Sequence, residues 1–383
     1  MKRPDMMRRL SPIAATAFAP ALLLAACSGE AETGPAPLTE EALAAVTDNA
    51  GAPREQLARQ VDDLFSDPLV AETRAVIVVA NGELAAERYG EGYGPETRFI
   101  SWSMAKTVTA VLIGMLVSEG KLDLDRGPPI PAWRRPGDPR GDITLRQLLQ
   151  MRSGLRHTEA GDPVYESDEV RMLFLDGRDD MAAWAEAQPP EAGAGAKFEY
   201  SSNTTVILAD IAARVLAGQD ASPEERRAAV AGYLREQLFG PLGMDSMLPE
   251  FDADGTLIGG SLMHATARDW AKFGEFLRRE GRTADGVQLV PKAWVEFMTR
   301  PSPREEQYGA QTWLNRKPTN GDPVLFPGTG ADTLFSMVGH LGQYVIVSPD
   351  QGLTVVRLGK TQDAERAPLV KALGDIVELY PSR

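Results

Sequence analysis

The sequence predicts an α+β protein in which one sheet is built from both ends of the chain. Residues 74–90 contain two apolar runs around Asn81-Gly82, a dipeptide that favours a tight hairpin turn. A second β-rich stretch covers residues 334–358, and residues from about 120 to 325 alternate helical patterns with loops rich in Pro and Gly. We therefore expect helices against one sheet and a helical lobe inserted between its strands.

The helices are predicted from apolar residues at helical spacing and from the residues that end each pattern. Residues 106–119 form the most apolar of these segments, and Gly120 closes it. Five further helices are expected, at 145–151, 204–216, 228–238, 267–279 and 367–379.

Composition excludes several functional classes. The 383 residues are 43% hydrophobic and 25% charged, which is ordinary for a globular protein and unlike a disordered or polytopic membrane chain. The net charge is −14 and no long basic run occurs, so nucleic acid is not an expected partner. One Cys and three His, none of them in H-E-x-x-H, exclude a disulfide framework and predict no metal or other cofactor.

Residues 1–26 are predicted to be a bacterial export signal, with four basic residues in the first nine positions and an apolar stretch behind them. The segment ends in Leu24-Ala25-Ala26-Cys27, which resembles a lipobox, the signal in which the Cys is lipidated and becomes the new N-terminus. A plain signal peptide with a chance Cys is the alternative. Because Cys27 is the only Cys in the chain, we expect a lipoprotein anchored in the membrane and facing the periplasm, with Ser28 indicating the outer membrane.

The remaining chain divides into a predicted tether and one domain. Residues 27–55 are mostly small, acidic and Pro-containing, and are expected to form a flexible tether. Residues 56–383 are expected to fold as one unit. Its α/β lobe would come from about 56–110 and 325–383, and its helical lobe from about 111–324.

The first chemical motif is Ser103-Met104-Ala105-Lys106, an S-x-x-K; the sequence lacks a P-loop, a dinucleotide-binding glycine motif and a G-x-S-x-G elbow. Ser103 precedes an apolar helix, so Lys106 lies one turn on, and the helix dipole favours a developing oxyanion near Ser103. A desolvated Lys has a lowered pKa and can act as a base. A capping Ser followed by a snorkelling Lys is an equal alternative, and Ser118 begins a second S-x-x-K at the end of the same helix.

Two later motifs add candidates. Tyr200 lies in a polar loop before a helix, where its phenol could point into a cleft; near a cationic Lys its pKa would drop, which suits proton transfer. His340-Leu341-Gly342-Gln343 lies in an apolar strand region, where Gly permits close approach of a ligand. A capped surface Tyr and an internally satisfied strand His are the alternatives.

Taken in order, the S-x-x-K, the Tyr with Asn about a hundred residues on, and the late [K/H]-x-G resemble the serine β-lactamase and penicillin-binding-protein superfamily. The chain is most similar to its class C-like serine hydrolases: family VIII esterases, D-aminopeptidases and, most closely, 6-aminohexanoate-dimer hydrolases. The resemblance runs from about residue 74 to 383 and rests on FISWSMAKTVTAVLIGMLVSEGKLDLD, ITLRQLLQMRSGL, KFEYSSNTTVILADI, LFGPLGMDSM, ATARDWAKFGEFL and GHLGQYVIVSPDQGLTVVRLG.

The resemblance implies a β-lactamase/transpeptidase-like fold, with an antiparallel five-stranded sheet flanked by helices and an inserted all-helical lobe. It also implies that Ser103 is the acylated nucleophile, that Lys106 takes its proton, and that Tyr200 passes this proton to the leaving group. The N–H groups of Ser103 and Gln343 would form the oxyanion hole.

This chain departs from the family pattern at the substrate-binding positions. The usual pattern is Tyr-x-Asn, but here Ser202 stands two residues after Tyr200 and Asn203 follows it, so either residue could fill the Asn role. His340 stands where β-lactamases carry the Lys that grips the penicillin carboxylate, two residues before Gly342. An imidazole is a weaker anion site near pH 7, which disfavours efficient β-lactamase activity. Tyr165 lies in the loop region that carries a substrate-binding Tyr in the 6-aminohexanoate-dimer branch.

Two functions therefore stay open. The first is a serine hydrolase that cleaves small-molecule esters or amides through an acyl-enzyme on Ser103. The second is a catalytically weak surface lipoprotein that binds peptidoglycan-type peptides or a protein partner. The joint presence of Ser103, Lys106 and Tyr200 favours the enzyme, because a decayed site is expected to lose at least one of them.

Overall fold

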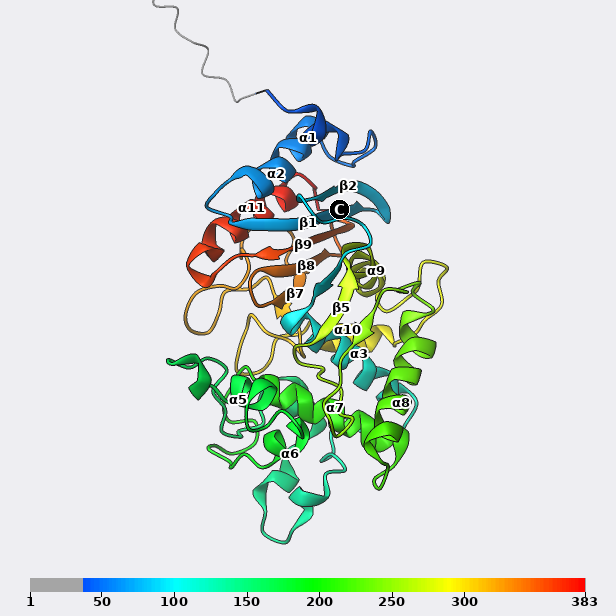
Figure 1. Ribbon diagram of the computed structural model, residues 1–383, viewed down its shortest axis with the longest axis vertical. Helices are drawn as coiled ribbons and strands as arrows, with labels where there is room; N and C mark the ends of the chain where they lie inside the picture. Colours follow the sequence, from blue (N-terminus) through cyan, green and yellow to red (C-terminus); the bar gives the residue numbers. More distant parts are fainter. Residues whose placement is uncertain (1–36, 383) are drawn as a thin grey trace, which may run out of the picture. The chain divides into compact units, whose positions relative to one another are not determined.

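A six-stranded antiparallel sheet in the order β2-β1-β9-β8-β7-β6 forms the centre of the α/β lobe of the protein (Figure 1). The computed structural model describes residues 37–382. The expected five-stranded sheet is present, extended by a sixth strand of two residues. The strands are β1 Glu72–Ala80, β2 Glu83–Tyr89, β6 Trp313–Leu314, β7 Phe335–Gly339, β8 Gln343–Ser348 and β9 Leu353–Lys360.

The predicted hairpin at Asn81-Gly82 is confirmed. Both residues have positive φ, 55° and 88°, the combination that a two-residue turn between right-twisted strands requires. Strand β9, from the far end of the chain, then pairs with β1 from Glu72↔Lys360 to Ala80↔Leu353. This pairing joins the two ends of the folded chain in one sheet, as the sequence predicted.

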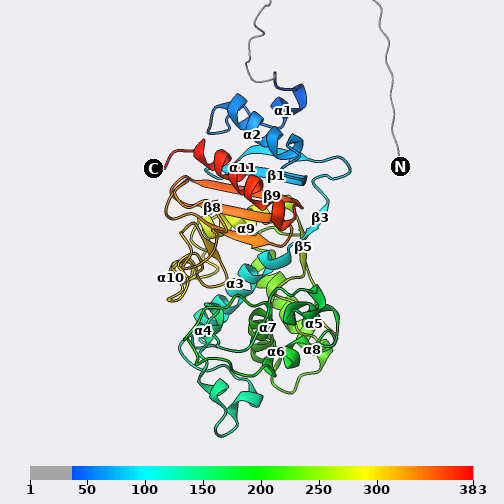
Figure 2. The same cartoon turned by 90° about the vertical axis from the view of Figure 1, so that its left-hand side faces the viewer.

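Helices cover both faces of the sheet, so its central strands are nearly continuous apolar runs (Figure 2). α2 Arg54–Ser66 and α11 Arg366–Glu378 cover one face, where Val76 of β1 joins their apolar cluster. α9 Ala267–Arg278 covers the other face and packs with the neighbouring β1 residue Ile77. The predicted helical lobe, 111–324, was therefore wrong in including α9, because the apolar face of this helix packs on the sheet.

The folded unit also begins earlier than predicted. Residues 27–55 were expected to be a tether, but α1 Glu40–Ala44 lies within them, and Val46 bridges Ala86 of β2. Ala42 and Val46 are buried against the hairpin. These small apolar side chains hold the segment from Leu38 onward on the sheet, so the tether prediction is corrected there. The predicted signal, the lipobox and Cys27 lie outside the described residues.

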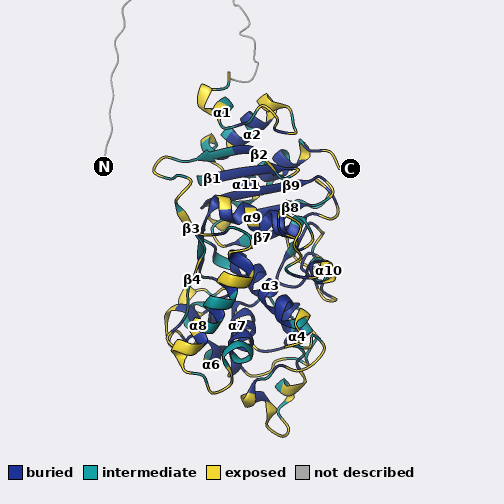
Figure 3. Ribbon diagram, turned by 90° about the vertical axis from the view of Figure 1, so that its right-hand side faces the viewer, coloured by how far each residue is buried: buried dark blue, intermediate teal, exposed yellow. Residues whose placement is uncertain are grey.

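The buried helix α3 Ala105–Ser118 lies between the sheet and the helical lobe (Figure 3). Every residue of α3 from Ala105 to Leu116 is buried, and a helix enclosed on all sides is apolar all round. The other helices are α4 Leu145–Leu149, α5 Asp168–Phe174, α6 Met181–Glu186, α7 Ser202–Ala217, α8 Pro223–Leu234 with a π-helical turn Arg235–Phe239, and α10 Lys292–Met298.

A small three-stranded sheet leads the chain into α3. Its strands are β3 Arg98–Ile100, β5 Met263–Thr266 and β4 Leu248–Pro249, in the order β3-β5-β4. Since α3 packs against α7, the residues before α3 and those at the start of α7 come together. None of the helices in the described range combines the length and the apolar character that crossing a membrane requires.

Candidate active site

Ser103 lies on a sharply bent segment between β3 and α3. A single 3₁₀ turn, Trp102–Met104, connects the two elements. Trp102 has φ 44°, a left-handed conformation that is unfavourable for a bulky side chain and that persists where surrounding contacts enforce it. Ser101 supplies one such contact, since its backbone N–H donates to Met263 O at 2.8 Å. The bend places Ser103 in the wall of a pocket.

Lys106 lies one turn beyond Ser103, with only 1% of its surface exposed. Its Nζ is 2.9 Å from Ser103 Oγ, 2.8 Å from Ser202 Oγ and 2.9 Å from the carbonyl oxygen of Gly260. Burial lowers the pKa of this amine, and two nearby carboxylates oppose that shift. A neutral amine has two N–H groups, which Gly260 and Ser202 accept, so its lone pair faces the Ser103 hydroxyl, as a general base requires.

Tyr200 packs beside this amine, just before α7. Its ring centroid lies 4.8 Å from Lys106 Nζ, and the ring packs against Trp313 at 5.3 Å. Burial and then the charge of Glu159 raise the pKa of Tyr200 well above its usual value, although a hydrogen bond with Ser103 acts in the opposite direction. The expected drop of this pKa was therefore wrong, because desolvation and the Glu159 charge dominate, and the phenol keeps its proton and can donate it.

Ser202, rather than Asn203, contacts the amine. Its Oγ lies 2.8 Å from Lys106 Nζ, in the first turn of α7. Asn203 is 3% exposed, and neither polar atom of its side chain has a hydrogen-bond partner among the described residues. The helical turn directs these neighbours to different sides, so Ser202 holds the position next to the amine that the family pattern gives to Asn.

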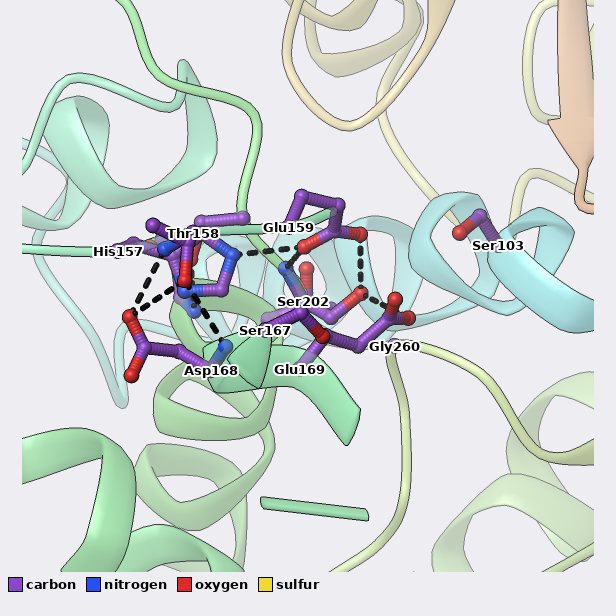
Figure 4. A network of polar contacts seen from close by, with 12 residues as sticks. Ser103, His157, Thr158, Glu159, Ser167, Asp168, Glu169, Ser202 and Gly260 are labelled. Atoms are coloured by element: carbon purple, nitrogen blue, oxygen red, sulfur yellow. Dashed lines mark hydrogen bonds and ion pairs between the residues drawn. The ribbon is translucent and has the colours of Figure 1, made fainter. Parts of the chain in front are cut away.

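Two carboxyl groups that sequence reasoning missed complete the cluster (Figure 4). Glu159 Oε1 is 3.8 Å from Lys106 Nζ and 2.6 Å from Ser202 Oγ, while its Oε2 contacts His157 Nε2 at 2.7 Å. Glu169 Oε1, from α5, lies 3.0 Å from Ser202 Oγ. Glu159 lies in a loop and Glu169 in the short helix α5, and both are far from Ser103 in sequence. No spacing pattern in the sequence identifies them.

The two carboxyl groups titrate differently. Burial alone would raise the pKa of Glu159, but the charge of Lys106 and hydrogen bonds from His157 and Ser202 lower it to about 2. Burial and the charge of Glu159 raise the pKa of Glu169 to about 7. The site thus holds one carboxylate that is fixed as an anion and one carboxyl that exchanges its proton near neutral pH.

A pocket of about 630 Å³ opens over Ser103. It is lined by Ser103, Tyr200, Glu159, Glu169, Trp313 and His340, among others. A cavity of about 730 Å³ between the β1–β2 hairpin and α9 is larger, but its lining residues include no Ser–Lys–Tyr cluster. The chemistry therefore places the candidate site at the smaller pocket. No cluster of potential ligands in residues 37–382 is arranged to hold a metal ion.

Of the remaining predicted residues, some line this pocket and others do not. His340 and Gly342 line it, and the His340 ring meets Trp102 edge-on at 5.3 Å. Tyr165 is 60% exposed and does not line the pocket, whereas its neighbour Val164 does.

Gln343 does not line the pocket either. Its side-chain amide donates to the carbonyl oxygens of His340 at 3.0 Å and Gly359 at 2.7 Å, and so closes the β7–β8 turn. Its backbone N–H as an oxyanion donor stays a prediction. The second S-x-x-K has no comparable cluster, because Ser118 Oγ donates to Met115 O at 2.8 Å and Lys121 pairs with Glu119.

One curated protein is similar in sequence to about two thirds of this chain. A 6-aminohexanoate-dimer hydrolase from Paenarthrobacter ureafaciens is 25% identical over 268 residues, which are 66% of this chain and 63% of that protein. The chain thus spans just under two thirds of this curated relative.

Solved structures give the same fold at lower identity. A candidate 6-aminohexanoate-dimer hydrolase from Bacillus anthracis superimposes with a TM-score of 0.66 at 22% identity, over 83% of this chain and 81% of the other. A family VIII carboxylesterase gives a TM-score of 0.59 at 15% identity, over 83% and 96%.

The family model described as Beta-lactamase matches residues 61–375, which covers both lobes and every residue of the Ser103 cluster. The chain therefore belongs to the beta-lactamase family.

Proposed function

We propose that the protein is a serine hydrolase that cleaves esters or small amides through an acyl-enzyme on Ser103. The observation that carries this proposal is the distance of 2.9 Å between Ser103 Oγ and the buried amine of Lys106. Acceptors at Gly260 and Ser202 take the other hydrogens of that amine. A hydroxyl without such a base is a poor nucleophile, and burial lowers the pKa of this base, which favours its neutral form.

The proposed reaction uses these groups in two half-reactions. Lys106 takes the Ser103 proton as Oγ attacks the substrate carbonyl carbon, and the N–H groups of Ser103 and, as predicted, Gln343 stabilise the oxyanion. Tyr200 donates its phenolic proton to the leaving group and is reprotonated from Lys106. In the second half, water attacks the acyl-Ser103 ester, its proton returns through the same groups, and the carboxylic acid leaves.

Uncharged substrates, or substrates without an anion near the reacting bond, suit this pocket best. Glu159 lines the pocket and is held as an anion near Lys106, so a substrate carboxylate close to it would be repelled. His340 lines the pocket in place of a permanently charged Lys. The relatives' names, a 6-aminohexanoate-dimer hydrolase and a family VIII carboxylesterase, support keeping both the amide and the ester class in the proposal.

We further propose that the protein is exported and anchored by a lipid at Cys27. The support is the lipobox-like Leu24-Ala25-Ala26-Cys27 behind a short apolar stretch. The overall charge of −14 disfavours adhesion to anionic lipid through the protein surface, so the anchor would be the acyl chains.

Replacing Ser103 tests the mechanism. Ser103→Ala should lower kcat/KM on the order of 10³-fold or more, because the base has nothing to activate. Lys106→Ala should cost nearly as much, and the double variant little more. Tyr200→Phe keeps the ring but loses the donor, and should lower kcat. Ser118→Ala is the matched control and should retain activity. A fluorophosphonate should add mass to the Ser103 peptide alone. Wild-type turnover in Ser103→Ala would contradict an acyl-enzyme on Ser103, and a wild type with no turnover would favour the binding-protein alternative.

Neighbouring substitutions on α7 test which residue holds the base. Ser202→Ala removes an acceptor from Lys106 and leaves the amine to pair with Glu159, so kcat/KM should fall on the order of 10²-fold at neutral pH. Asn203→Ala removes no hydrogen bond and should change activity little. Steady-state kinetics on both variants, with thermal unfolding to check the fold, decides the point. Equal losses in the two variants would contradict the assignment.

Substrate preference tests the pocket argument. Short p-nitrophenyl esters should turn over much faster than a chromogenic cephalosporin. His340→Lys should raise cephalosporin hydrolysis by about tenfold, equivalent to about 1.4 kcal/mol, because it places a fixed cation at the position where β-lactamases carry a Lys. Tyr165→Lys adds the same charge outside the pocket and should not. Efficient cephalosporin turnover by the wild type, with poor ester turnover, would overturn the proposal.

Membrane fractionation tests the anchor. Wild-type protein expressed in a Gram-negative host should sediment with membranes, and its mature mass should include the lipid. Cys27→Ala should release the protein into the soluble fraction, and Ser28→Ala is the neighbouring control that should stay bound. An unmodified N-terminus in the wild type would show that the lipobox interpretation is wrong.

A further inference from the structure

The hydrogen-bond array around Ser202 has one proton too few for the groups that share it. Ser202 Oγ lies 2.8 Å from Lys106 Nζ, 2.6 Å from Glu159 Oε1 and 3.0 Å from Glu169 Oε1. A hydroxyl has one hydrogen to donate and two lone pairs that accept. Lys106 donates to one lone pair, and the single hydrogen serves only one of the two carboxyl groups. The other carboxyl must bring its own proton.

The contacts of the two carboxyl groups decide which one carries that proton. Glu159 accepts hydrogen bonds on both oxygens, from Ser202 Oγ on Oε1 and from Ser202 N and His157 Nε2 on Oε2. A carboxylate surrounded by donors is stabilised as the anion. Within residues 37–382, the side chain of Glu169 has no hydrogen-bond contact other than Ser202 Oγ. The missing proton therefore belongs between Glu169 and Ser202.

We propose that Glu169 is a positioning residue that donates a hydrogen bond to Ser202 as a neutral carboxylic acid, and that its charge state sets the proton affinity of Lys106. This inference rests on the proposed function, since it assigns the control of the base that activates Ser103. Burial and the charge of Glu159 raise the pKa of Glu169 to about 7, which agrees with the proton count.

The charged groups around Glu169 determine how its ionisation changes the protonation of Lys106. Glu159, Lys106 and His157 act on it within the cluster, while His340, Asp363 and Arg366 lie on other parts of the same pocket wall. When Glu169 is an anion, a second carboxylate favours the ammonium form of Lys106, which cannot accept the Ser103 proton.

The acid limb of Ser103 acylation should therefore lie at higher pH in the wild type than in a protein with a permanently neutral residue at 169. An anion raises the pKa of a nearby amine, and activity rises with pH as that amine loses its proton. Removing the anion moves the limb to lower pH.

Glu169→Gln provides that neutral residue, because its amide donates to Ser202 and never ionises. The rate of fluorophosphonate labelling at Ser103, measured by peptide mass from about pH 5 to 10 on the full chain, should have its midpoint about 1 pH unit lower than in the wild type. Glu166→Gln is the matched control: it removes one negative charge from the neighbouring, exposed segment and should leave the midpoint in place. A midpoint that is unchanged or higher in Glu169→Gln overturns the proposal.

Infrared spectroscopy separates failure of this inference from failure of the proposed function. At about pH 6 the wild type should show a protonated-carboxyl band that titrates near pH 7 and that Glu169→Gln lacks, while Glu166→Gln keeps it. Buried Glu186 and Asp252 also have raised pKa values, of about 9 and about 6, so the band is assigned to Glu169 by its loss in Glu169→Gln. Absence of any protonated-carboxyl band that titrates near pH 7 in the wild type overturns the assignment of Glu169, even if that variant does not fold. If Ser103 is never labelled but the band is present, the hydrolase proposal fails and the proton assignment stands.

Discussion

The buried amine of Lys106 is the constraint on which the rest of the site depends. Burying an amine on an apolar helix costs free energy of folding unless each of its hydrogens and its lone pair has a hydrogen-bond partner. Those partners, Ser103, Ser202 and Gly260, come from three segments that are distant in sequence. The start of α3, the start of α7 and the loop before β5 must therefore lie close together around Lys106. The packing of the two lobes brings these segments together.

The architecture makes this meeting rigid. α3 is buried along nearly its whole length between the sheet and the helical lobe, so neither end of the Ser103–Lys106 pair can shift without disturbing both lobes. The left-handed backbone at Trp102 is a local cost that such packing can sustain. The sheet that supports this arrangement is closed by the pairing of β1 with β9, which joins the two ends of the fold.

The carboxyl groups of Glu159 and Glu169 compensate the buried amine, but they also compete with its role as a base. Each anion near Lys106 favours the charged form, which holds its proton and cannot activate Ser103. Ser202 Oγ contacts the amine and both carboxyl groups, while the direct ion pair between Lys106 and Glu159 is longer, at 3.8 Å. Stability of the buried charge and reactivity of the nucleophile are thus set by the same few hydrogen bonds.

The sequence alone determined the features that depend on neighbours along the chain: the hairpin at Asn81-Gly82, the helix after Ser103, and the helical spacing that puts Lys106 over it. It also located Tyr200, because ordered motifs resemble those of a known family. Only the tertiary structure decided the electrostatics, since burial and Glu159 raise the Tyr200 pKa that local reasoning expected to fall. Likewise, Ser202 rather than Asn203 faces the amine, and Glu169 joins the cluster, because long-range packing of α5 and α7 leaves no mark in residue spacing.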